Sequence, residues 1–296
     1  MFGNRHFPVF VSAGALCAAL VLGSCSSAPD EEKDVYSRKT QADSLMEQGH
    51  RAIDSLEHDL AEVSYAEALG IYASLDLRDQ TVAALLALGR SCQMNDDNDG
   101  TQAYFNHAAA LVERSDNARL KQDVTNHLAA DALRREDWDR AADLLEDSPD
   151  SPVDGRERAA QLRLQGSLKE SLGYAEEASL LLEEAAQVAL ASDEAVEAAL
   201  AFYKLASIAS LASRYDEAFA WALKALEADK SAEYTPGIAS DLRALAIISD
   251  KSGRKADAED YYRRSWLAWR GLGRDEDAEN SRMRLEEISG RAMMLP

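Results

Sequence analysis

The histidines are the first side chains to consider for chemistry, because imidazole serves both in acid–base catalysis and as a metal ligand. Four of them follow the N-terminal segment, at His50, His58, His107 and His127, and none is spaced from a cysteine or another histidine as metal ligands are. The 296-residue chain also lacks a P-loop, a dinucleotide-binding glycine pattern and a Gly-x-Ser-x-Gly nucleophile turn. We therefore predict a protein that is not an enzyme and that binds no metal ion.

An acidic segment at residues 95–100 superficially resembles a calcium-binding loop. Asn95 occupies the opening position, where aspartate is usual, and Asn106 stands where the bidentate glutamate is expected. We therefore interpret this segment as an acidic hairpin turn and predict no cofactor beyond a covalent lipid, which the following features indicate.

The N-terminal segment has the composition of a secretory leader. Arg5 supplies a positive charge at the start, and residues 7–22 form a 16-residue span without a charge. That span is shorter than the roughly 20 residues that a membrane-spanning helix needs. The pattern predicts a signal peptide over residues 1–24.

The leader ends in Leu22-Gly23-Ser24-Cys25, which resembles the bacterial lipobox. The resemblance implies that the Cys25 thiol receives a diacylglyceryl group, that cleavage occurs before it, and that its new amino group is acylated, commonly with palmitate. Ser26, in place of an aspartate, implies sorting to the periplasmic face of the outer membrane. An uncleaved anchor or ordinary secretion is the alternative.

A polar segment follows the lipobox, over residues 25–39, and carries Pro29. It predicts a flexible tether of about 14 residues that reaches at most roughly 45–50 Å. The formal charge of −21 disfavours nucleic acid and anionic lipid head groups as partners. Contact with the membrane is therefore expected through the lipid anchor only.

A small residue recurs along the rest of the chain at intervals of 40, 40, 37, 40 and 40 residues, at Gly49, Gly89, Ala129, Gly166, Ala206 and Ala246. A second small residue follows each of these by twelve positions. Four positions further on stands a bulkier residue in five of the six cases, with Ala222 as the exception. Such a period predicts stacked copies of one supersecondary unit.

Within each copy the apolar residues have helical spacing, and turn residues divide the copy into two helices. This pattern resembles the tetratricopeptide repeat. The leucine before the small residue is present as Leu88, Leu128, Leu205 and Leu245. Two departures are a repeat of about 40 residues in place of 34 and the absence, in most units, of the proline that often ends the second helix. The resemblance implies an all-α, right-handed superhelical solenoid of about six helical hairpins over residues 40–274.

Two further boundaries follow from the sequence. The third repeat stops at Pro149 and Pro152, which predicts a bend near residues 148–155 between two halves of three units each. After a Gly-Leu-Gly break, residues 275–296 are expected to form a capping helix and a tail, and the helix is expected to cover Trp266 and Trp269.

The resemblance also implies a concave groove lined by the first helix of each hairpin. The positions expected to face it are Met46, His50, Leu86, Arg90, Arg134, Arg163, Tyr203, Arg243 and Lys251. Because arginine binds carboxylates bidentately, one hypothesis is a groove that captures a peptide segment bearing an acidic group. The alternative is that these arginines pair with nearby carboxylates of the chain, at Asp43, Asp123, Glu170 and Asp250.

The sequence thus predicts a non-catalytic adaptor of the bacterial envelope, tethered by lipid, that binds a protein or peptide partner in its groove. One alternative is an accessory lipoprotein of an outer-membrane assembly, pilus, secretion or transporter complex. A second alternative is a small-molecule-binding helical-repeat protein with a pocket near Tyr203 or Trp221.

Overall fold

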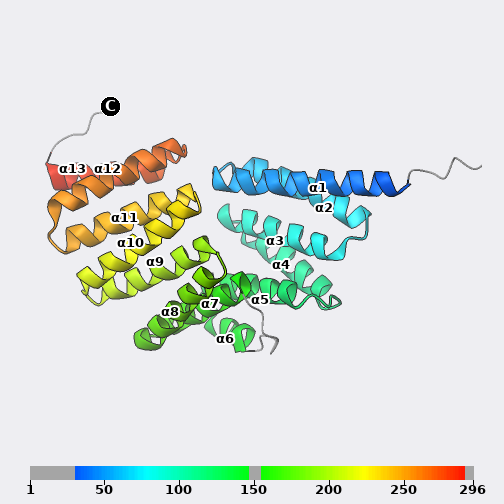
Figure 1. The fold of residues 1–296 in the computed structure, drawn as a ribbon, viewed down its shortest axis with the longest axis horizontal. Helices are drawn as coiled ribbons and strands as arrows, with labels where there is room; N and C mark the ends of the chain where they lie inside the picture. The colour runs from blue at the N-terminus through cyan, green and yellow to red at the C-terminus, as the bar shows by residue number, and fades with distance from the viewer. Residues whose placement is uncertain (1–30, 147–154, 291–296) are drawn as a thin grey trace, which may run out of the picture.

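The computed structural model describes residues 31–146 and 155–290, and within them the chain forms thirteen α-helices and no strand (Figure 1). The predicted signal peptide, the Cys25 lipid site and most of the predicted bend lie outside the described residues. The helices are α1 (Glu31–Asp54), α2 (His58–Ser74), α3 (Arg78–Met94), α4 (Asn98–Val112), α5 (Ala118–Arg134), α6 (Trp138–Glu146), α7 (Arg156–Ser171), α8 (Ala175–Ala191), α9 (Ala195–Leu211), α10 (Tyr215–Ser231), α11 (Thr235–Lys251), α12 (Lys255–Gly271) and α13 (Asp275–Ser289).

Successive helices pair into six hairpins, and the hairpins stack side by side in a curved array (Figure 1). The curvature places α1 and α2 across from α11 and α12. The thirteenth helix packs on α12 and ends the array. The predicted all-α solenoid of six hairpins with a capping helix is therefore confirmed. None of the helices among the described residues is long and apolar enough to cross a membrane.

The first helix begins earlier than the sequence analysis expected. Residues 31–39 belong to α1, so this part of the predicted flexible tether is helical. The physical reason is composition, because no proline or glycine follows Pro29 until Gly49 and most of the intervening residues are good helix formers. Tyr36, near the start of α1, is 67% exposed and so contributes little packing.

Each hairpin is held together by a small residue on its first helix and a side chain sixteen positions later on its second. A Cβ atom added to Gly89 would lie 2.3 Å from the Phe105 ring, and one added to Gly49 would lie 2.4 Å from the Tyr65 ring. Both aromatic side chains are buried. The absence of a side chain at the glycine therefore allows the ring to pack against the backbone of the first helix.

The turns explain the length of the repeat. Eight of the described helices contain 17 residues, and three-residue turns separate most neighbours. The middle turn residue has a positive φ, as in Glu233 (54°) and Gly253 (79°). The next backbone N–H then bonds back to the helix end, as Tyr234 N does to Asp229 O at 2.9 Å. Two such helices and two such turns make up the 40-residue interval.

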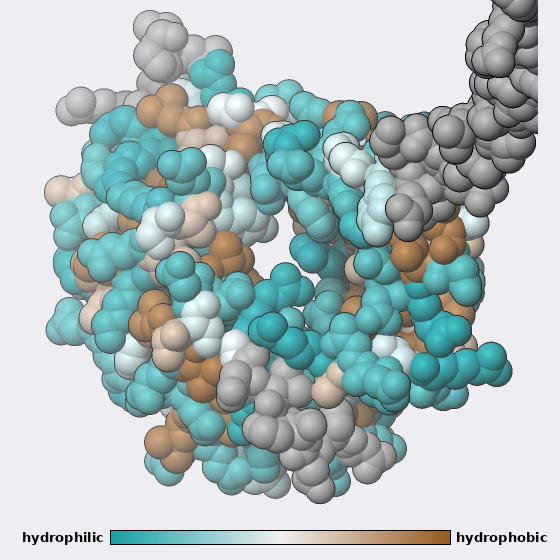
Figure 2. Space-filling view, turned by 45° about the vertical axis from the view of Figure 1, so that its right-hand side comes forward, coloured by the Kyte–Doolittle hydropathy of each residue, from teal (hydrophilic) through white to brown (hydrophobic). Residues whose placement is uncertain are grey.

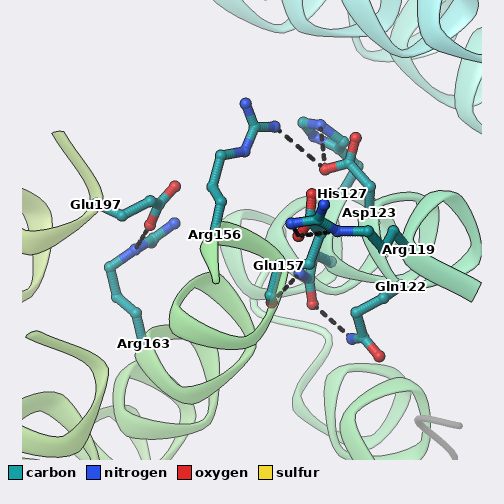
Figure 3. Close-up of polar contacts among 9 residues, drawn as sticks. Arg119, Gln122, Asp123, His127, Arg156, Glu157, Arg163 and Glu197 are labelled. Atoms are coloured by element: carbon teal, nitrogen blue, oxygen red, sulfur yellow. Dashed lines mark hydrogen bonds and ion pairs between the residues drawn. The ribbon is translucent and has the colours of Figure 1, made fainter. Parts of the chain in front are cut away.

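The third hairpin departs from this regularity, and a polar network replaces part of its packing. Helix α6 contains only 9 residues, and α7 packs on α5. An Arg156 guanidinium nitrogen lies 3.3 Å from Asp123 Oδ1, and the Asn126 amide donates to the Glu157 carbonyl at 2.8 Å. Figure 3 shows Arg156 of α7 beside Asp123 and His127 of α5. Burial lowers the pKa of His127 to about 3, so this histidine stays neutral inside the network.

The two ends of the array touch. Leu56, in the turn between α1 and α2, packs against the apolar cluster of α12 and α13. That cluster contains Trp266 and Trp269, which are 4% and 6% exposed, together with Leu285 of the capping helix. The capping helix thus covers the tryptophans as expected, and the contact with Leu56 closes the superhelix on itself.

Replacing Gly89 with alanine tests the close contact within a hairpin. We expect Gly89→Ala to lower the free energy of unfolding by about 1–3 kcal/mol, because the new methyl group overpacks the buried Phe105 ring. Denaturant unfolding followed by circular dichroism measures the change. Gly70→Ala on α2 is the matched control, since nothing lies within 4 Å of its added Cβ. The control is expected to gain about 0.5–1 kcal/mol from helix propensity. Equal effects of the two substitutions would contradict the packing argument.

Candidate functional site

A groove follows the concave side of the C-terminal half, where α9, α11 and α13 lie next to one another. Figure 2 shows the molecule hollowed at its centre, with hydrophobic residues on one side of the opening. Three cavities of about 160, 310 and 740 Å³ occupy this region, and Tyr203 lines all of them. We call the surface formed by these three cavities the concave groove.

The concave groove contains exposed apolar side chains, although the protein as a whole is strongly acidic. Tyr203, Ile247 and Met283 are 39%, 38% and 49% exposed, and they come from α9, α11 and α13 in turn. Ser207 and Ala244 also line the smallest cavity, and their short side chains leave room beside Tyr203. Adjacent exposed apolar side chains of this kind mark a surface suited to a partner.

Three of the four predicted groove residues of the C-terminal half, all except Arg163, come together in the structure. Tyr203, Arg243 and Lys251 line the same cavity of about 740 Å³, together with residues of the capping helix. Their convergence follows from the repeat, because equivalent faces of successive first helices turn toward the inside of the curve.

The predicted groove residues of the N-terminal half are not brought into one site. Leu86 is 3% exposed and packs against Phe105 and Val124, so its assignment to the groove is wrong. Met46 is partly buried against the hairpin core. His50 is exposed, and its Nδ1 lies 2.9 Å from the Tyr65 hydroxyl.

The groove arginines are held mainly by carboxylates of the chain. Arg163 Nε lies 3.0 Å from Glu197, and Arg243 lies 3.5 Å from Asp277. Each pair joins the first helix of one unit to the first helix of the next, or to the capping helix. Arg134 likewise contacts Asp131 of its own helix at 2.9 Å. The hypothesis of free arginines that capture an acidic group is therefore wrong for these three.

The carboxylates differ from those that the sequence analysis named. Glu170 pairs with Lys204 at 2.9 Å, and Asp123 pairs with Arg156. For these two pairs the partners lie 34 and 33 residues apart, on the first helices of successive units. Among residues 31–146 and 155–290, Arg90 and Lys251 form no ion pair.

A buried pair of carboxyl groups lies beside the concave groove. Asp229 of α10 and Asp241 of α11 are 4% and 2% exposed, and their carboxyl groups hydrogen-bond to each other. Burial raises the pKa of Asp229 to about 7, against a smaller lowering by the hydrogen bond from Asp241. Burial, with the charge of Asp229, raises the pKa of Asp241 to about 8. At neutral pH the pair therefore retains a proton.

The sequence analysis missed this acid pair, although the repeat carries a signal for it. Forty residues on either side of Asp229 stand Ala189 and Trp269, which are both buried. Forty residues on either side of Asp241 stand Ala201 and Ser281, which are also buried. An aspartate at a position that is buried in the neighbouring units indicates a carboxyl group that is itself buried.

Comparison with known proteins supports the tetratricopeptide architecture. Residues 197–265 match the family model of the tetratricopeptide repeat, and this span runs from α9 into α12. No curated protein sequence matches the chain.

Solved structures share the fold at low sequence identity. The crystal structure of a Rap protein complexed with competence and sporulation factor matches with a TM-score of 0.65 and 14% identity, over 88% of this chain and 83% of that one. A signal transduction ATPase with a tetratricopeptide repeat sensor from Pyrococcus horikoshii matches with a TM-score of 0.59 and 12% identity, over 90% of this chain and 46% of that one. BtubC from P. vanneervenii matches with a TM-score of 0.52 and 15% identity, over 80% of this chain and 92% of that one.

The acid pair makes stability depend on pH. Both carboxyls have a higher pKa in the folded protein than the value of about 3.9 in an unfolded chain. The folded state therefore binds more protons between about pH 4 and pH 8, and the free energy of unfolding falls as pH rises through this range. We expect Asp241→Asn to flatten this fall and to be about 1–3 kcal/mol more stable than wild type at pH 8.

Denaturant unfolding at pH 5, 6, 7 and 8 measures the effect. Asp250→Asn is the control, because Asp250 is an exposed acid of the same helix. The control should follow the wild-type profile. Parallel profiles for wild type and Asp241→Asn would show that the pair does not titrate as described.

Proposed function

We propose that the protein is a non-catalytic adaptor that holds an extended segment of a partner protein in the concave groove. The observation that carries this proposal is the row of exposed apolar side chains on α9, α11 and α13, which Tyr203, Ile247 and Met283 form. The family match covers residues 197–265, which include much of this surface.

Electrostatics define the kind of segment that fits. Arg163 and Arg243 are paired with carboxylates within the chain, which leaves Lys251 as the cation in the cavity wall that could attract an acidic segment. The apolar side chains instead favour a segment with apolar residues, which would bury them on binding. The similarly folded Rap protein was solved in complex with competence and sporulation factor, so a solenoid of this kind accommodates a partner.

The proposal includes attachment to the bacterial envelope through a lipid on Cys25, at the periplasmic face of the outer membrane. The lipobox-like end of the leader supports it. Because α1 begins at Glu31, only residues 26–30 separate the anchor from the first helix. Five residues span at most roughly 18 Å, so the array would lie close to the lipid surface.

Capture of the partner from intact cells tests the groove. Crosslinking, purification through the folded domain and mass spectrometry should recover a specific envelope protein with wild type. We expect Tyr203→Ser combined with Ile247→Glu to reduce recovery at least about tenfold, because the two substitutions remove central apolar contacts. The identity of the protein recovered distinguishes an accessory role in an outer-membrane assembly, pilus, secretion machine or transporter complex.

Val63→Glu serves as the matched control, since Val63 is 57% exposed but lies on α2, away from the groove. It should recover the partner as wild type does. If the double variant folds with the wild-type helical content and recovers the partner in full, the concave groove is not the binding surface. A small molecule that co-purifies with wild type and no protein partner would favour the alternative of a ligand-binding repeat protein.

A further inference from the structure

The cavity of about 310 Å³ in the concave groove has an unusual wall. Asp229 and Asp241 line it, together with Tyr203, Tyr234 and Leu200. The cavity therefore combines two buried carboxyl groups with two aromatic rings and an aliphatic side chain. Of the residues that line it, none is a lysine, arginine or histidine, so nothing in this wall neutralises the two acids.

Two of the four carboxyl oxygens of the acid pair lack donors from the described part of the fold. Among the described residues, no N–H or O–H group of another side chain or of the backbone donates to Asp229 Oδ1 or Asp241 Oδ2. Both oxygens are shielded from solvent, where a carboxyl group without donors is unfavourable. The interaction between the two acids themselves is the main compensation that the structure provides.

The backbone is adapted to hold the pair. Gly237 lies in the first turn of α11, and a Cβ atom there would lie 1.8 Å from Asp229 Oδ2. Only a glycine at this position leaves room for the Asp229 carboxyl group. The fold thus accommodates two acids that lower its stability at neutral pH, which is common where buried charge serves binding.

We propose that this cavity binds the cationic group of a lysine or arginine side chain of the partner segment, with the ammonium or guanidinium group at Asp229 and Asp241. The proposal rests on the adaptor function and adds a recognition element to the same groove. A basic side chain is also the form of ligand that the cavity fits, because its aliphatic stem can lie along Tyr203 and Leu200 while its charged end meets the acids.

Charge balance defines a signature of this binding. The pair holds a proton when the cavity is empty of a cation, and an inserted cation takes over the role of that proton. The proton leaves to solvent as the ion pair forms, so binding strengthens as pH rises from 6 to 8. The other ionisable groups that line the cavity are the phenols of Tyr203 and Tyr234.

Titration calorimetry with three matched probes tests the proposal on the purified protein. The probes are the Nα-acetyl methylamides of lysine, arginine and norleucine, of which the last has a similar stem but no charge. We expect the lysine or arginine probe to bind at least about tenfold more tightly than the norleucine probe. Titrations in buffers of different ionisation enthalpy should show that the cationic probe releases up to one proton at pH 7.

Variants separate this site from other acidic groups. Asp229→Asn combined with Asp241→Asn should abolish both the preference for the cationic probe and the proton release. Glu227→Gln is the control and should leave both unchanged, because Glu227 is an exposed acid of α10 that lines none of the three cavities of the concave groove. Equal binding of the norleucine probe, or unchanged lysine binding by the double variant, would overturn the proposal. Binding of K⁺, Mg²⁺ or free spermidine, without either cationic amino-acid probe, would overturn it as well.

The capture experiment from intact cells distinguishes failure of this inference from failure of the proposed adaptor function. If the Asp229→Asn, Asp241→Asn protein recovers the partner as well as wild type does, the acid pair takes no part and the adaptor function stands. If recovery falls at least about tenfold and the probes show the expected preference, both are supported. If Tyr203→Ser with Ile247→Glu has no effect on recovery, the groove itself fails as the binding surface.

Discussion

The contact between a small residue and a bulky one sixteen positions later sets the geometry on which the whole array depends. Where the small residue is Gly49, Gly89 or Gly166, the bulky side chain lies closer to the first helix than any added Cβ would allow. The helices of a hairpin are therefore held at a short distance, and each hairpin presents the same two faces to its neighbours. Repetition of this unit produces the curve, and residues of α9, α11 and α13 line one groove on its concave side.

The sequence was sufficient for the features that repeat and insufficient for those that occur once. The recurring small residues predicted the hairpins, and the capping helix followed from the break after α12. The helical structure of residues 31–39 was not predicted, because a polar composition without glycine or proline suits both a flexible tether and an exposed helix. Leu86 was misplaced because its position in the repeat gives the helix face only approximately, and the neighbouring α4 and α5 cover it. The partners of Arg163 and Arg243 depend on how successive units are set against one another, which the period alone does not define.

Charge is used differently in the two parts of the concave face. Between successive units, Arg163 with Glu197 and Lys204 with Glu170 form ion pairs that align first helices without closing the groove. In the wall of the groove, Asp229 and Asp241 stand without a cation, at positions where the neighbouring units bury other residues. An otherwise acidic protein thus satisfies most of its inward-facing cations internally and leaves a local excess of buried acid. Specificity in such a groove would come from this one irregular position, set among apolar side chains that tolerate varied partners.

Leu56 has a consequence for the route by which a partner arrives. Leu56 packs on the apolar cluster at the other end of the array, so the superhelix forms a closed loop around its central opening (Figure 2). A chain that crosses this opening has to be threaded through it by a free terminus, unless the contact at Leu56 first breaks. Threading would select partners by the location of the segment within their own sequence and not only by its side chains.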